Sequence, residues 1–178
     1  MHSRQIVPQY LFPSHDIRNI PSIDGALIAA NVFKHWVEEN KGWRVIQDLD
    51  SQKREIDITR MLQLAAISSL RPYNLDISCE VDDGNGYVDL KISCGNDKTV
   101  VEVKLTSNTH WKHGYENQIW RYSKASNAEG MVFILIDTGN PDVVDRIVQI
   151  HEQRINAGQK EPELIIIDAK KKKSASRV

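Results

Sequence analysis

Two short stretches of the chain place acidic residues and a lysine at a spacing typical of paired strands. Asp89 lies within the apolar-polar alternation of residues 86–92, and Glu102 and Lys104 lie two residues apart in residues 99–105. Because side chains alternate faces along a strand, Glu102 and Lys104 would share one face, and the aliphatic residues beside them would line the other. Turn-forming residues 95–98 separate the stretches, so an antiparallel hairpin would bring Asp89 near Glu102.

Two carboxylates and a lysine gathered in this way could hold a divalent cation. Neighbouring carboxylates repel each other, and a hard cation such as Mg²⁺ or Mn²⁺ would compensate both charges. The cation could polarise a phosphoryl oxygen and lower the pKa of a water, while Lys104 orients that water or stabilises charge on the phosphate. The alternative is a solvated strand face with an ordinary ion pair between the strands.

A third motif lies downstream, where Gln118 and Tyr122 are four residues apart in a predicted helix that precedes the apolar strand 131–136. Residues at this spacing share one helix face. With these motifs the chain resembles the PD-(D/E)XK nuclease superfamily over residues 55–137. The Gln-x-x-x-Tyr motif is similar to that of the RecB-type exonuclease branch, and Val88 stands where the nominal superfamily motif has Pro.

The resemblance implies an α/β fold with a restriction-endonuclease-like core, in which a central mixed β-sheet is flanked by helices in the order αβββαβ. It implies that Asp89, Glu102 and the Val103 backbone carbonyl bind Mg²⁺ or Mn²⁺, and that Lys104 joins the two acids in catalysis. Gln118 and Tyr122 would lie beside the DNA phosphate or the active site.

Many members of the superfamily also carry a glutamate on the first core helix. Glu55 is the best candidate for this catalytic position, and Asp57, Glu38 and Glu39 are the alternatives.

Further residues around these motifs could contact nucleic acid. Arg121 is expected to be exposed and to touch a phosphate, and His113, like His110, lies just after the E-x-K strand as a polar or phosphate-contacting residue rather than a zinc ligand. Trp111 is expected in an exposed loop, where it could stack on a base, whereas Trp120 is expected in the core.

Composition fits one soluble globular domain over residues 1–178. The chain is 40% hydrophobic and 26% charged, and it contains no stretch of about 20 consecutive apolar residues that would span a bilayer. Its first residues do not resemble a signal peptide, so we expect a cytoplasmic (intracellular) protein without a membrane partner. Cys79 and Cys94 are expected to be small buried hydrophobic residues rather than a disulfide or a metal site.

The net charge of −1 provides no global attraction to DNA. A nuclease can still gather its positive charge around a cleft, or take part in a homodimer or a larger protein complex. The alternative function is therefore a nucleic-acid-binding or scaffold subunit of a larger defence or mobile-element complex, with catalysis lost or dependent on partners. DNA is the expected substrate, while the choice between DNA and RNA and between endo and exo cleavage stays open.

Proline and glycine positions and the apolar periodicity predict the order of the elements. An irregular arm precedes a helix that Ser22 or Asp24 caps and that Gly42 ends. A basic, disordered tail closes the chain. The predicted segments are the arm 1–22, helix 22–40, strand 43–46, helix 56–70, strands 75–81, 86–92 and 99–105, the helix around Gln118, strand 131–136, a helix opened by Pro141, strand 164–167 and the tail 169–178.

Overall fold

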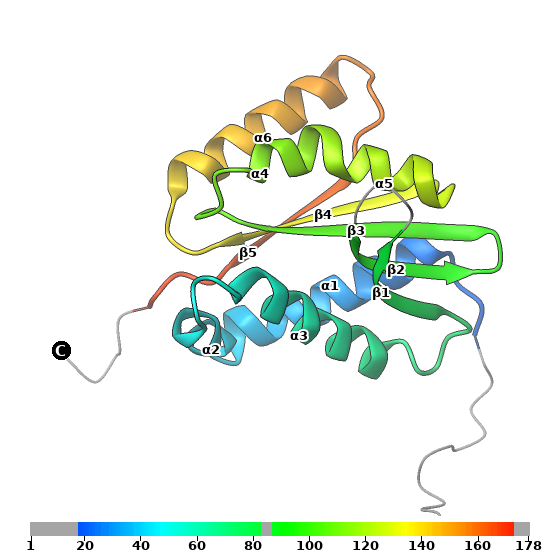
Figure 1. Cartoon of the computed structure of the whole chain (residues 1–178), viewed down its shortest axis with the longest axis horizontal. Helices are drawn as coiled ribbons and strands as arrows, with labels where there is room; N and C mark the ends of the chain where they lie inside the picture. Colours follow the sequence, from blue (N-terminus) through cyan, green and yellow to red (C-terminus); the bar gives the residue numbers. More distant parts are fainter. Residues whose placement is uncertain (1–17, 83–86, 173–178) are drawn as a thin grey trace, which may run out of the picture.

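The sheet of this protein has five strands and a mixed topology (Figure 1). The computed structural model describes residues 18–82 and 87–172. Strands β1 (Asp76–Asp82), β2 (Tyr87–Cys94) and β3 (Asp97–Leu105) form an antiparallel meander, and β4 (Gly130–Asp137) and β5 (Glu163–Asp168) follow as parallel neighbours. The spatial order is β1-β2-β3-β4-β5, so the sequence-predicted strands from residue 75 onward are confirmed to within about two residues.

Helices cover both faces of this sheet, as Figure 1 shows. One face carries α1 (Ser22–Glu39), α2 (Gly42–Asp48) and α3 (Arg54–Ser69). The other carries α4 (Trp111–His113), a π-helical turn η2 (Gly114–Gln118), α5 (Ile119–Ser126) and α6 (Pro141–Asn156). The expected α/β architecture with a mixed sheet between helices is therefore confirmed. Within 18–82 and 87–172, no helix is both long and apolar enough to cross a membrane.

The two central strands are buried on both faces, and their alternation decides which way the site residues point. Along β4, Val132, Ile134 and Ile136 pack under α1 and α3, whereas Met131, Phe133 and Leu135 pack under α5 and α6. On β3, Val101 and Val103 face the α1–α3 layer and Val100 faces the opposite layer. Because side chains alternate along a strand, Glu102 and Lys104 face the layer of α4 and α5.

The prediction of a strand at residues 43–46 is wrong, because these residues belong to helix α2. Trp43 and Ile46 are buried and Val45 is exposed, which is the spacing of a helix and not of a strand. Gly42 does not end the preceding helix, which stops at Glu39. It begins α2, and a Cβ at this position would lie 2.7 Å from ring atoms of Trp36.

The start of α1 is bonded to the start of β3. The Ser22 N–H and hydroxyl donate to the two carboxylate oxygens of Asp97 at 2.7 and 2.6 Å, and the hydroxyls of Ser22 and Thr99 are 2.8 Å apart. The sequence predicted that Ser22 or Asp24 would cap the helix, but no side chain at its N-cap position does so. The capping acceptor comes from Asp97, 75 residues away.

The two ends of the chain fall partly outside the described residues. Of the arm expected at 1–22, only residues from Arg18 onward are described, and Arg18 forms an isolated parallel bridge with Tyr73. The prediction of a disordered tail from residue 169 onward is wrong for residues 169–172. Ala169 is fully buried, Lys170 pairs with Asp137 at 3.1 Å, and Lys172 donates to the Glu38 carbonyl at 3.1 Å. The last six residues of the expected tail lie outside the described part.

We predict that Asp97→Ala lowers the free energy of unfolding by about 1–3 kcal/mol, because the buried Ser22 hydroxyl and the helix start lose their acceptor. Asp145→Ala, at an exposed position on α6, is the matched control. Urea denaturation followed by circular dichroism measures both variants. Equal midpoints for the two variants would contradict the fastening role of Asp97.

Candidate active site

Asp89 lies on β2, one residue before the part of this strand that pairs with β3. The paired register of the two strands reaches Leu90 opposite Val101, and beyond it the carboxylate of Asp89 accepts a hydrogen bond from the Val103 N–H at 2.7 Å. The side chain of Asp89 thus bonds the β3 backbone at the end of the ladder. The proximity of Asp89 to β3 that the hairpin predicted is confirmed, and the hydrogen bond fixes one carboxylate oxygen.

Lys104 lies between two carboxylates. Its Nζ is 2.8 Å from Glu102 Oε1 and 2.8 Å from Glu55 Oε1, and it also donates to the Val103 carbonyl at 3.2 Å. Glu102 is 2% exposed and Lys104 is 7% exposed. The solvated strand face considered from the sequence is therefore wrong, because both side chains are enclosed.

Glu55 is the carboxylate of α3 that reaches this cluster. It lies in the first turn of α3, and its second oxygen, Oε2, accepts a hydrogen bond from the Asn108 amide at 2.8 Å. Among the alternatives, Asp57 pairs with Arg60 at 3.2 Å and Glu38 pairs with Lys34 at 3.6 Å. The contact with Lys104 thus selects Glu55 from the candidates that the sequence left open.

Sequence reasoning missed Asn108, which connects Glu55 to the segment leading into α4. Its amide donates to Glu55, and its Oδ1 accepts the His110 N–H at 2.8 Å. Both ends of the Asn108 side chain are therefore engaged, which holds the Glu55 carboxylate in one orientation. The available signal was an asparagine in the turn that directly follows the E-x-K strand, where such side chains commonly bond nearby backbone.

Gly114 was also missed, and its role is to make room for Lys104. A Cβ at position 114 would lie 2.9 Å from Lys104 Cε and 3.1 Å from its Cγ. Because the ammonium end is held by two carboxylates, the lysine stem has little freedom to give way. The first residue of η2 therefore needs to be glycine for the helical layer to lie directly on the lysine.

Burial and neighbouring charge act on the protonation of the cluster. Burial, followed by the negative charge of Asp89, raises the pKa of Glu102 to about 8, although Lys104 opposes this shift. Burial by itself would lower the pKa of Lys104, but the carboxylates of Glu102, Asp89 and Glu55 outweigh it and raise that pKa above its usual range. Lys104 is therefore a charged ammonium across the physiological pH range.

The residues present fit a small, hard cation. Glu102 Oε2 is buried and has no hydrogen-bond partner among residues 18–82 and 87–172, so no group described there compensates this oxygen. Asp89 is close enough to raise the Glu102 pKa, and the Val103 carbonyl belongs to the same cluster.

Within the described residues, no three His, Cys, Asp or Glu side chains converge as a complete metal-binding set. A cation here would combine two carboxylates and a carbonyl, and Mg²⁺ commonly keeps several waters beside so few protein ligands.

Tyr122 is buried in the helical layer that Glu102 and Lys104 face. Burial raises the pKa of the Tyr122 phenol, and the negative charges of Glu102 and Asp89 raise it further. Gln118 ends η2 and is half-buried, and Arg121 is exposed on α5 as expected. The substrate roles of Tyr122, Gln118 and Arg121 stay predictions.

The helical layer that carries Tyr122 is fastened to α6 by a second polar network. The Tyr115 hydroxyl bonds His151 Nδ1 and Glu161 Oε2, each at 2.7 Å. Arg154 pairs with Glu116 at 2.7 Å, and its guanidinium lies over the Tyr115 ring. Two residues of the π-helical turn are therefore bonded to α6 and to the segment that follows it, which limits movement of the turn against Lys104.

The position expected for Trp111 is wrong. It begins α4 and is 6% exposed, packed in the core beneath the helices, so it is not available for stacking on a base. Trp120, expected in the core, is half-buried and lines a surface pocket. His110 and His113 are exposed, which agrees with their expected surface position, and a phosphate contact at His113 stays a prediction.

Comparison with known proteins gives one match. The family model described as Domain of unknown function (DUF8371) matches residues 24–140, about two thirds of the chain, and the chain belongs to this family. The matched region contains Glu55, Asp89, Glu102, Lys104 and Tyr122. Searches of curated proteins and of solved structures found no match.

We predict that the stability of the metal-free protein falls with rising pH between about 4.5 and about 8 through Glu102. A carboxyl whose pKa is higher in the folded than in the unfolded chain favours folding when protonated, and this contribution is lost as it ionises. The melting temperature of the wild type minus that of Glu102→Gln, measured in EDTA across this range, should therefore decrease with pH. Glu152→Gln, at an exposed position on α6, should give a flat difference. A flat difference for Glu102→Gln as well would show that Glu102 titrates normally.

Proposed function

We propose that this chain, a member of a family whose description assigns no function, is a Mg²⁺- or Mn²⁺-dependent nuclease that hydrolyses phosphodiester bonds of DNA. The observation that carries the proposal is the enclosed cluster at the end of the β2–β3 ladder. There Asp89, Glu102, Lys104 and Glu55 meet, and one buried carboxylate oxygen lacks a partner.

The order of the elements supports a restriction-endonuclease-like core. From α3 onward the chain runs α3, β1, β2, β3, the consecutive helical segments α4, η2 and α5, and then β4. If these three segments are counted as one helix, this is the αβββαβ order implied by the resemblance to PD-(D/E)XK nucleases. Glu55 lies on the first helix, Asp89 on the second strand and Glu102 on the third. Tyr122 lies on the second helix, so each motif residue falls on the element where that superfamily would have it.

Each side chain of the cluster has a definable task. Asp89, Glu102 and the Val103 carbonyl would hold the cation, which when bound polarises a phosphoryl oxygen and lowers the pKa of a water. Hydrolysis forms a bond from water oxygen to phosphorus and breaks a phosphorus–ester bond, so negative charge grows on the phosphate. Lys104 is a fixed ammonium in a site of low dielectric, where it stabilises this charge and orients the water.

Glu55 acts through Lys104. By accepting from the ammonium and from Asn108, it fixes the direction of the lysine side chain. Tyr122, buried beside the acids, and Gln118, on the adjoining turn, would position the substrate strand.

The second candidate function is a nucleic-acid-binding or scaffold subunit without catalysis of its own. The observation that favours it is the internal compensation of the cluster, since Lys104 pairs with both Glu55 and Glu102 at 2.8 Å. Such a network can hold α3 against β3 whether or not a cation ever binds. Metal binding by the isolated protein distinguishes the two functions.

We predict that the purified protein cleaves plasmid or linear DNA with Mg²⁺ or Mn²⁺, and that Glu102→Ala and Lys104→Ala each lower the rate by about 100-fold or more, because each removes charge aimed at the reacting phosphate. Asp145→Ala, on the exposed side of α6, should cleave like the wild type. Gel electrophoresis of timed digests measures the rates. Equal rates for the wild type and the two cluster variants would indicate a contaminating nuclease and would contradict the proposal.

We predict opposite effects of two substitutions on Mn²⁺ affinity measured by isothermal titration calorimetry. Glu102→Gln should weaken binding by about 10-fold or more, because it removes a ligand charge, whereas Lys104→Met should strengthen it, because it removes the cation that competes for the same carboxylate. Arg60→Met, which alters an exposed ion pair of α3, is the control for Lys104→Met. Absence of Mn²⁺ binding in all proteins, together with retained DNA binding, would favour the non-catalytic subunit.

A further inference from the structure

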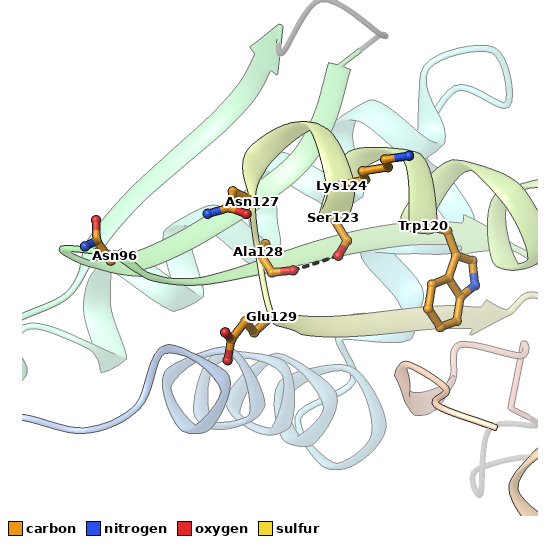
Figure 2. A pocket seen from close by; sticks show the side chains of 7 residues that line it. All are labelled: Asn96, Trp120, Ser123, Lys124, Asn127, Ala128 and Glu129. Carbon is orange, nitrogen blue, oxygen red and sulfur yellow. Dashed lines mark hydrogen bonds between the residues drawn. The ribbon is translucent and has the colours of Figure 1, made fainter. Parts of the chain in front are cut away.

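A second candidate site lies on the other side of α5 from the catalytic cluster. A pocket with a volume of about 660 Å³ opens there, between α5, the β2–β3 turn and the loop that leads from α5 to β4 (Figure 2). Trp120 is two residues from Tyr122, which corresponds to roughly 200° around a helix. Tyr122 therefore faces the catalytic acids while Trp120 faces the pocket. The lining residues are Asn96, Trp120, Ser123, Lys124, Asn127, Ala128 and Glu129.

The lining offers an aromatic face together with hydrogen-bonding groups. Figure 2 shows the Trp120 indole at one end of the pocket and Asn96 and Asn127 toward the other. Trp120 is half-buried, so part of its ring is accessible, and both asparagines are exposed. Between them the Ser123 hydroxyl donates to the Ala128 carbonyl at 2.7 Å, which fixes the loop that follows α5. An aromatic face beside amide donors and acceptors is suited to a nucleobase.

Basic side chains lie in and beside the pocket. Lys124 lines it together with one carboxylate, that of Glu129. Beside the lining, Lys160 Nζ donates to the Glu129 carbonyl at 2.9 Å, and Lys98 Nζ donates to the carbonyl of Ser126, close to the lining residue Asn127, at 3.3 Å. A ligand with an aromatic base and a phosphate matches the indole of Trp120 and the ammonium of Lys124.

We infer that this pocket binds one nucleotide of a single-stranded substrate, with its base stacked on Trp120 and its phosphate near Lys124. The choice of a nucleic-acid strand rests on the proposed function. The pocket and the catalytic cluster lie on opposite sides of α5, so one strand that crosses this helix could reach both.

The inference restricts the class of substrate. A base can stack on Trp120 only when it is neither paired with a complementary base nor stacked between its neighbours in a duplex. A paired duplex therefore cannot occupy the pocket without local unpairing. Single strands and frayed ends should therefore bind better than blunt duplex. This preference comes from the accessible indole, and Trp111, the stacking residue expected from sequence, does not contribute to it because it is buried.

We predict that Trp120→Leu and Lys124→Ala each weaken binding of a fluorescently labelled oligothymidylate by about 10-fold, because they remove a stacking face and a phosphate contact. Anisotropy is measured in EDTA on the Glu102→Gln background, so binding is read without cleavage or metal. Trp120→Phe keeps an aromatic ring and should retain most of the affinity, which separates stacking from a packing role of the indole. Lys112→Ala is the matched control, because Lys112 is an exposed lysine of the same helical layer away from the pocket.

The outcomes separate the pocket from the catalytic proposal. Unchanged affinity in Trp120→Leu, equal weakening by Lys112→Ala and Lys124→Ala, or equal affinity for blunt duplex and single strand would each overturn the inference. If the protein cleaves DNA and Trp120→Leu binds normally, the pocket assignment fails while the nuclease proposal stands. If binding depends on Trp120 but no metal supports cleavage, the nuclease proposal fails while the nucleotide site stands.

Discussion

The ammonium of Lys104, held between the carboxylates of Glu55 and Glu102, joins three parts of the molecule that are far apart in sequence. Glu55 starts α3 on one face of the sheet, Lys104 and Glu102 belong to the central strand β3, and Gly114 brings the opposite helical layer onto the lysine stem. A buried ion pair seldom stabilises a fold more than apolar residues of the same volume would. Its presence inside this core, with one carboxylate oxygen that has no partner in the described part of the chain, is therefore consistent with the proposed chemistry.

The surroundings of that interaction are arranged to keep it in one geometry. Asp89 is fixed by the Val103 backbone, Glu55 by Asn108, and the π-helical turn by the bonds of Tyr115 and Glu116 to residues of α6 and the segment after it. Such support holds charged groups at set distances, and in the proposed reaction it would lower the reorganisation needed when charge develops on a bound phosphate. The polar network behind η2 therefore contributes to the site although none of its members touches the cluster of acids.

Positive charge is distributed unevenly along the chain, although the net charge is low. Residues 104–126, which run from Lys104 to the end of α5, contain four Lys or Arg residues and one acidic residue, whereas the whole chain carries a net charge of −1. Arg121 and Lys124 are exposed on α5. Under the proposed function, this local positive charge would attract a polyanion that the chain as a whole does not attract.

The sequence by itself determined which side chains of β3 share one face, the β2–β3 hairpin that brings Asp89 near β3, and the position of Tyr122 on a helix. These features depend on local periodicity and on the residues of the turn. It also indicated Glu55 but could not select it from Asp57, Glu38 and Glu39, since that choice depends on which helix end reaches Lys104. Residues 43–46 were misassigned because a short apolar run fits a strand or a helix equally well, and packing on the neighbouring helix decided between them. Only the tertiary structure decided the burial of Glu102, the roles of Asn108 and Gly114, and the burial of Trp111, because these arise from contacts between segments that no local pattern encodes.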